Sequence, residues 1–250
     1  MVRFGFEIAS SLDPETSPKY QIKLLNLHED EEVSEPYLTE VNSKGQVPSL
    51  TSPLLPANLT DSRDISNWLC EQQPLLVPAE HRVSINKLMD QLYAFHAMAL
   101  SIPDKDRIYG VPNVAAAMLE RSDISEQHRR ALEMKSVFHD TNYCRTLEPD
   151  NVDHTEFLCR MFISGLEEVL TADTRTEDQR WLFETATIID AHAVPMISRL
   201  LERERSDLVP STVEAYAKRV MESEEWKRTT HGRGTVFDKQ YGHVRDLQPI

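Results

Sequence analysis

The sequence predicts a small α/β module followed by an all-helical one. Residues 20–27 alternate between apolar and polar side chains over most of their length, which is typical of a strand. From Pro78 onward, apolar residues recur almost throughout at the spacing of helices. Only 7 of the 250 residues are glycine, and a low glycine content disfavours strand-rich folds with many tight turns. Most of the chain is therefore expected to be helical.

The first part of the chain, residues 1–74, combines the predicted strand with irregular segments. Residues 46–50 are apolar and β-like but contain a proline, so we expect an edge strand or an irregular one. A turn at 53–56 leads into a helix that Asp61 or Ser62 can cap.

The remainder of the chain predicts a series of amphipathic helices. The strongest apolar stripe runs from Phe157 to Leu170, and another opens at Thr187. Shorter stripes begin at Leu88, Val114, Leu132 and Val213. The stripe at Leu132 lies in a helix that we expect to start after the capping residue Ser125. We expect a polar surface tail from Gly232 to Ile250. The sequence predicts a first domain at residues 1–74, a linker at residues 75–84 and a second domain at residues 85–250.

The N-terminal segment supports two interpretations. Val2, Phe4, Phe6 and Ile8 alternate strictly with other residue types, which is a strand pattern. Phe4 and Ile8 also lie four residues apart, on one face of a helix. Periodicity does not decide between strand and helix in a segment this short.

Composition excludes several classes of function. The net charge is −14, which excludes nonspecific binding of nucleic acids or anionic membranes as the main function. No run approaches the ~18 apolar residues of a membrane span, and no signal-peptide pattern is present. The three cysteines, Cys70, Cys144 and Cys159, are widely spaced and odd in number, which suits a reducing compartment. We therefore expect a cytoplasmic protein.

Metal binding is not expected from the sequence. His139 with Cys144, and His154 with Cys159, are each five residues apart, but neither pair is accompanied by two further ligands at zinc spacing. A Gly-x-Ser-x-Gly elbow and a phosphate-binding loop are also missing from the sequence.

Four segments together point to a family. Residues 42–50, NSKGQVPSL, look like an Asn-Pro-x-Gly-x-Val-Pro-x-Leu segment, and residues 59–62, LTDS, look like a Leu-x-Glu/Gln-Ser element that opens a helix. Residues 187–190 resemble a Ser/Thr-x-x-Asp capping box, and residues 210–226 with 231–233 resemble the terminal helix and tail of many microbial members. With these segments in order and at the expected spacing, the chain resembles the cytosolic glutathione S-transferase superfamily over nearly its whole length.

The resemblance implies a fold and a mode of binding. The expected fold is a thioredoxin-like α/β domain, truncated at its start, followed by the all-helical domain of the family. In the family the proline that corresponds to Pro48 is cis, and its turn exposes the backbone of the residue that corresponds to Val47. That backbone pairs with the cysteinyl backbone of glutathione as an added strand. Taken without the other motifs, Pro48 favours the simpler interpretation of a proline that ends an edge strand.

Three further residues are expected to contact glutathione. Asp61 and Ser62 stand at a helix start, where backbone N–H groups and the helix dipole favour a carboxylate. The resemblance implies that Ser62 binds the γ-glutamyl carboxylate and that Asp61 takes the α-ammonium group. Gln46 would reach the glycyl end. An ordinary capping pair and an exposed edge glutamine would show the same residues.

Other residues receive structural or substrate roles. Thr187 and Asp190 would satisfy the N–H groups at a helix start, and we expect no contact between them and a ligand. Phe95, Met98 and Tyr109, near the first long helices after the linker, are the expected wall for an electrophile. Core packing is the alternative role for at least one of these three.

The residue that would activate the glutathione sulfur is not identified. In the family a Tyr, Ser or Cys follows the opening strand, at the start of the first helix. Here Met1–Ala9 looks like the middle of that helix, so we expect the opening strand and the activator to be missing. If Val2–Ile8 is instead the opening strand, Ser10 or Ser11 would be the activator.

The expected function is that of a glutathione S-transferase involved in detoxification. It would add or substitute the glutathione thiolate onto a hydrophobic electrophile, with glutathione as co-substrate. A glutathione-dependent isomerase and a noncatalytic member that binds glutathione or a protein are alternatives. The resemblance also implies a homodimer. A helical adaptor unrelated to glutathione would require all four motif matches to be accidental.

Overall fold

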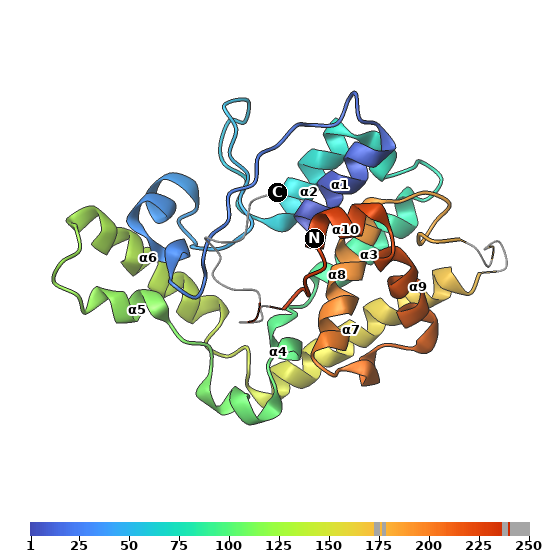
Figure 1. Cartoon of the computed structure of the whole chain (residues 1–250). Helices are drawn as coiled ribbons and strands as arrows, with labels where there is room; N and C mark the ends of the chain where they lie inside the picture. Colours follow the sequence, from blue (N-terminus) through green and yellow to red (C-terminus); the bar gives the residue numbers. More distant parts are fainter. Residues whose placement is uncertain (173–175, 177–178, 237–239, 241–250) are drawn as a thin grey trace. The chain divides into compact units, whose positions relative to one another are not determined.

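The computed structural model describes residues 1–172, 176, 179–236 and 240 (Figure 1). Of the predicted tail, residues 237–239 and 241–250 lie outside the described part. Two compact units are present, and each is described by itself. The first unit comprises Met1–Lys19, Ser66–Asp104 and Pro149–Asp238, and the second comprises Tyr20–Ile65, Lys105–Glu148 and Lys239–Ile250. No helix in the described residues is long and apolar enough to cross a membrane.

The predicted thioredoxin-like α/β domain is wrong. The described part of the chain contains no strand or sheet, and its one β feature is an isolated antiparallel bridge between Leu50 and Leu59. Residues 20–26, predicted as a strand, have no regular secondary structure. A strand needs a neighbour to take up its backbone N–H and C=O groups. The segment that could have opened the sheet, Val2–Ile8, is helical instead.

Helix α1, Val2–Leu12, decides between the two interpretations of the N-terminal segment. Phe4 and Ile8 are fully buried on its apolar face, which packs on α8 and α10. The strand interpretation is therefore wrong. Ser10 and Ser11 lie in the last turns of α1, so they do not follow an opening strand.

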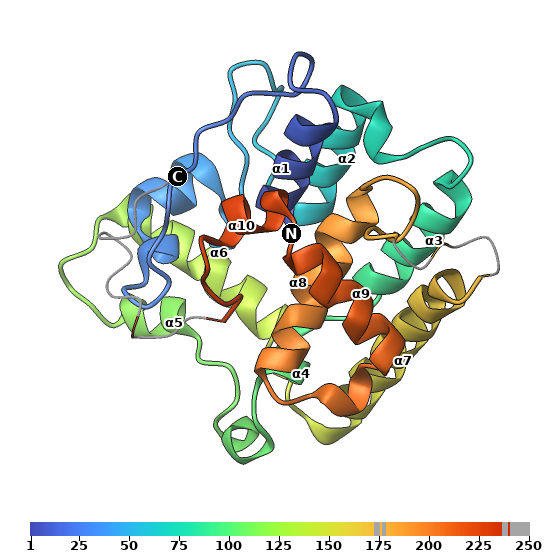
Figure 2. The ribbon, with the colours of Figure 1, turned by 45° about the vertical axis from the view of Figure 1, so that its right-hand side comes forward.

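The first unit is organised around α8, Ile188–Glu202 (Figures 1 and 2). Almost every side chain of α8 is buried, because α1, α3, α4 and α9 all pack against it. Helix α7 packs on α3 and α9, and α10 packs on α1. The bounds of these elements are α3 Arg82–Tyr93, α4 Met98–Ser101, α7 Pro149–Leu170, α9 Ser211–Met221 and α10 Glu224–Thr230, with η3 Pro74–Leu76 and η5 Ser206–Leu208 as short 3₁₀ turns.

The structure confirms the predicted capping box of α8. The buried Asp190 carboxylate accepts hydrogen bonds from the backbone N–H and hydroxyl of Thr187, both at 2.8 Å. It also accepts from the backbone N–H of Leu182 at 2.8 Å and from the hydroxyl of Tyr216 at 2.6 Å. Burial raises the pKa of Asp190, and the four donors oppose that shift. One carboxylate thus ties the start of the core helix to the preceding loop and to α9.

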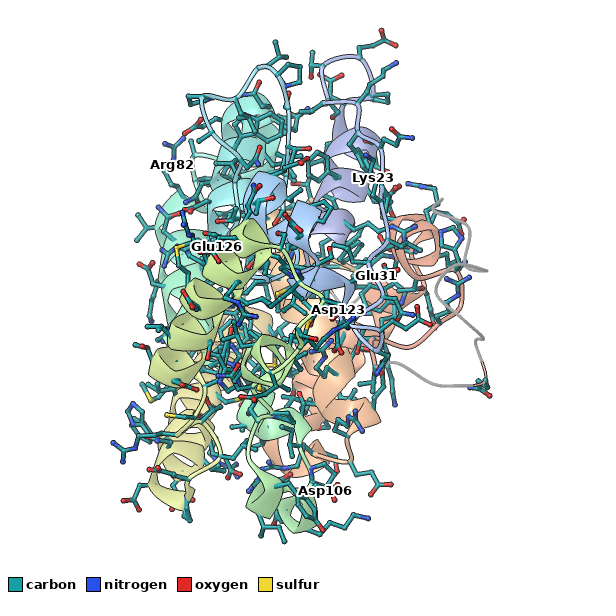
Figure 3. The ribbon with its side chains drawn as sticks, turned by 90° about the vertical axis from the view of Figure 1, so that its left-hand side faces the viewer. Lys23, Glu31, Arg82, Asp106, Asp123 and Glu126 are labelled. Carbon is teal, nitrogen blue, oxygen red and sulfur yellow. The ribbon has the colours of Figure 1, made fainter. Side chains whose placement is uncertain are left out.

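The second unit packs short elements on a long helix. Helix α6, Glu126–Asn142, begins at the predicted capping residue Ser125, whose hydroxyl accepts from the backbone of His128. Its core joins η1, η2, α5 and α6 through buried Val33, Leu38, Ala115, Ala131 and Leu132. Figure 3 labels Glu31 on η1 and Glu126 at the start of α6. The other bounds are η1 Glu31–Val33, η2 Tyr37–Val41, η4 Asp104–Tyr109 and α5 Val114–Leu119. Helix α2, Ser62–Gln72, begins in the second unit and continues in the first.

Candidate functional site

The predicted glutathione segment is anchored by side chains that precede it in the chain. Tyr37, at the start of η2, donates its hydroxyl to the backbone oxygen of Gln46 at 2.6 Å. The side-chain amide of Asn42 donates to the same oxygen at 2.9 Å. Gly45 adopts φ +55°, a backbone conformation that a Cβ would strain. The peptide unit before Val47 is therefore held in place by two donors.

Helix α6 contacts the same segment. Tyr143, the C-cap residue of α6, accepts a hydrogen bond from the side-chain amide of Gln46. Lys135 donates to the backbone oxygen of Gly45 at 3.3 Å. Burial lowers the pKa of Lys135 and raises the pKa of Tyr143, so the tyrosine hydroxyl keeps its proton at neutral pH.

An aromatic ring and two cations lie beside this segment. The ammonium groups of Lys44 and Lys135 lie 6.0 Å and 5.6 Å from the ring centroid of Phe138. Both distances fall within the ~6 Å range of cation–π contacts. The segment and α6 are thus joined by side chains of three kinds: a phenol, two lysines and a phenyl ring.

Val47 lies at the surface of its unit. The Val47–Pro48 peptide bond is cis, in agreement with the resemblance. Val47 is 43% exposed, and within the described residues neither its N–H nor its C=O has a hydrogen-bond partner. An unpaired backbone N–H and C=O can form hydrogen bonds with the backbone of a bound peptide.

The bridge brings the second predicted segment alongside the first. Leu50 and Leu59 exchange two backbone hydrogen bonds of 2.8 Å and 3.0 Å. In an antiparallel register, residues at equal distances from a bridged pair lie opposite each other. The bridge is isolated, and this pairing does not extend to Val47, which lies in a bend, or to Ser62, which opens α2.

Asp61 and Ser62 occupy the start of α2, as predicted. An Asp61 carboxylate oxygen accepts from the backbone N–H of Arg63 at 2.7 Å, and the Asp61 backbone oxygen accepts from Ile65 at 3.0 Å. The Asp61 side chain therefore caps α2, which is the ordinary role weighed above. Asp61 is exposed and Ser62 is half-buried, so both can be reached from solvent.

The structure places the predicted electrophile wall in two units. Phe95 and Met98 belong to the first unit, where the Phe95 ring centroid lies 6.5 Å from that of Phe162. Tyr109 belongs to the second unit and is 76% exposed. The contact with Phe162 fits the alternative role of Phe95, which is packing in the core. The wall itself stays a prediction.

A surface pocket of about 270 Å³ lies in the first unit, and none of the predicted site residues lines it. It is lined by α7, η5 and the residues before α9, including Arg160 and Asp207. The guanidinium of Arg160 donates to the backbone oxygen of Asp207 at 3.1 Å and lies 3.4 Å from its carboxylate, so these two charges of the pocket are paired with each other. Among the described residues, no group of three or more His, Cys, Asp or Glu side chains is arranged to hold a metal ion.

Sequence reasoning missed Tyr37 and Tyr143. Tyr143 is separated from Gln46 by 97 residues, so no local motif could link them. Tyr37 is nine residues from Gln46, but the irregular backbone between them has no period that would predict the contact.

Comparisons with known proteins leave the family open. No family model matches the chain, and neither a curated protein nor a solved structure gives a significant match. The resemblance therefore rests on the four sequence segments alone.

Proposed function

We propose that this protein binds glutathione at Gln46, Val47, Pro48, Asp61 and Ser62. The observation that carries the proposal is the exposed residue Val47, whose backbone has no hydrogen-bond partner within the described residues. The cysteinyl residue of glutathione carries one N–H and one C=O, and Val47 offers the complementary pair. Two such hydrogen bonds would hold the centre of the peptide against the chain.

The start of α2 suits the γ-glutamyl end of the peptide. A helix of 11 residues places the positive end of its dipole at Ser62, where it favours a negatively charged group. The Ser62 hydroxyl would bind the α-carboxylate, and the exposed Asp61 carboxylate would bind the α-ammonium group. The Leu50–Leu59 bridge supports this arrangement, because it brings the segment that follows Pro48 alongside the segment that leads into α2.

The noncatalytic alternative is the one that the geometry favours. A thiol of pKa ~8.5 is mostly protonated at neutral pH, so a transferase needs a group that stabilises the thiolate. The two serines considered for this role lie in α1, and the Ser11 hydroxyl accepts a hydrogen bond from Arg228 at 2.9 Å. We therefore propose glutathione binding with little acceleration of conjugation. Transfer to a hydrophobic electrophile is the second candidate, supported by the sequence resemblance.

Two further expectations belong to this proposal. A glutathione-binding protein with three widely spaced cysteines suits the cytoplasm, where thiols stay reduced. A homodimer, which the resemblance implies, can be measured by sedimentation equilibrium of the full chain.

Retention on immobilised glutathione tests the proposal. The wild-type chain should be retained and eluted by free glutathione, and Ser62→Ala should weaken retention. Ser84→Ala, an exposed serine of α3, is the matched control and should elute like wild type. Failure of the wild-type chain to bind would contradict the proposal. A conjugation assay with an aryl halide then separates the two candidates: turnover well above the solution rate would favour the transferase.

A further inference from the structure

Tyr143 is fixed firmly beside the proposed site. Its side chain is buried, with 8% exposure. Its ring meets Phe138 edge-on at a centroid distance of 6.0 Å and lies 5.7 Å from the ring of His139. These neighbours restrict the ring, and with it the position of the hydroxyl that receives the Gln46 amide.

The contact orders a side chain that would otherwise be mobile. A glutamine loses up to ~2 kcal/mol of rotamer freedom when it is fixed in one position. In this chain the Gln46 side chain loses its rotamer freedom during folding, because Tyr143 holds the Gln46 amide before any ligand binds. Binding to a pre-ordered group avoids that entropic cost.

The remaining donor of the amide can serve a ligand. A primary amide has two N–H donors, and Gln46 gives one of them to the Tyr143 oxygen. The backbone oxygen of the same residue is held by Tyr37 and Asn42, so both ends of Gln46 are anchored. The second N–H thus comes from a residue whose backbone and side chain are both fixed, directly before Val47.

We propose that Tyr143 is a positioning residue for the glycyl carboxylate of glutathione, acting through the side-chain amide of Gln46. This inference rests on the proposed function. Tyr143 itself would not touch the ligand. Its hydroxyl holds the amide so that the second N–H donates to the carboxylate at the glycyl end of the peptide.

Calorimetric titration of the full chain with two ligands tests this role. The ligands are glutathione and its glycyl ethyl ester, which lacks the negative charge at that end. Tyr143→Phe removes only the hydroxyl and should weaken glutathione binding about tenfold, the effect of losing a well-placed hydrogen bond to a charged group. Binding of the ester should change much less. Thr141→Val removes another hydroxyl of α6, one that donates to the Val137 backbone, and should change neither affinity.

A double-mutant cycle separates positioning from a general loss of structure. Gln46→Ala should show the same preference between ligands as Tyr143→Phe. The double variant should bind glutathione no more weakly than Gln46→Ala, because both changes remove one interaction. If Tyr143→Phe does not fold, Gln46→Glu carries the test: its charge should weaken glutathione binding more than ester binding.

The outcomes distinguish the inference from the function on which it rests. If the wild-type chain binds neither ligand, the proposed function fails and the inference falls with it. If the wild-type chain binds glutathione but Tyr143→Phe weakens both ligands equally or neither, the positioning role is overturned and the proposed function stands.

Discussion

The hydroxyl of Tyr37 donates to the backbone oxygen of Gln46 at 2.6 Å, and this contact fixes the peptide unit that precedes Val47. Burial raises the pKa of Tyr37, so the phenol remains a donor at neutral pH. The candidate site is therefore organised around a tyrosine from η2 and a tyrosine from α6, which hold the backbone and the side chain of the same glutamine.

Tyr37→Phe should lower both stability and glutathione affinity. The free energy of unfolding should fall by about 1 kcal/mol, the usual effect of one lost hydrogen bond, because Asn42 still donates to the same oxygen. Glutathione affinity should fall because the segment at Val47 is less well ordered. Urea unfolding and calorimetry measure the two effects. Unchanged affinity in a folded variant would show that this anchor does not serve ligand binding.

Asp190→Asn should strongly destabilise the first unit. An asparagine has one acceptor oxygen and would point its NH₂ group at donors that now bind the carboxylate. The expected loss is about 2–4 kcal/mol in the free energy of unfolding, since buried donors are left unsatisfied. Asp123→Asn, at an exposed aspartate, is the control and should change stability much less. Equal effects of the two changes would contradict the assigned role of Asp190.

Local and long-range features differed in how well the sequence predicted them. The capping box at Thr187 and the capping residue Ser125 were predicted correctly, because a cap depends on residues within one turn of each other. The strand at 20–27 was not, because a strand depends on a partner elsewhere in the chain. The two patterns in Val2–Ile8 coincide over seven residues, and burial of Phe4 and Ile8 on α8 and α10 decided for the helix.

In the candidate site, too, local features could be predicted from the sequence and long-range contacts could not. The residues of the Gln46–Pro48 and Asp61–Ser62 segments could be named from local motifs, and the structure places both segments in one unit. The contact between Gln46 and Tyr143 could not be predicted, since it depends on how α6 packs against η2 and the residues that follow it.

Acid should destabilise the protein through His192. This residue is fully buried between the hydroxyls of Ser66, at 2.8 Å, and Tyr93, at 3.2 Å, and burial lowers its pKa to about 3. Between about pH 6.5 and pH 3 the unfolded chain holds a proton that the folded chain does not, so stability falls as the pH falls. By pH 5 the loss should be about 2 kcal/mol. Urea unfolding at pH 7.5 and pH 5 measures it.

His192→Gln identifies the part of this pH dependence that belongs to the histidine. Glutamine is neutral throughout the range and can still bond to a hydroxyl, so the variant should lose less stability between pH 7.5 and pH 5 than wild type does. The same loss in both proteins would assign the acid sensitivity to other groups.

The three cysteines should differ sharply in reactivity. Cys70 and Cys159 have pKa values raised to about 12 by burial, whereas Cys144 is exposed. Because the thiolate is the nucleophile, iodoacetamide at pH 8 should alkylate Cys144 first in the folded chain and all three cysteines after denaturation. Peptide mass spectrometry follows each site. Rapid alkylation of Cys159 in the native protein would contradict its burial.

Pairing of glutathione with the backbone of Val47 can be followed at single residues. In a titration of the isotopically labelled full chain with glutathione, the backbone amide resonances are recorded at each ligand concentration. We expect the amides of Val47 and Ser62 to shift in a saturable way and the Val47 amide to exchange more slowly with solvent. Saturable shifts confined to other residues, or no shifts at all, would contradict it.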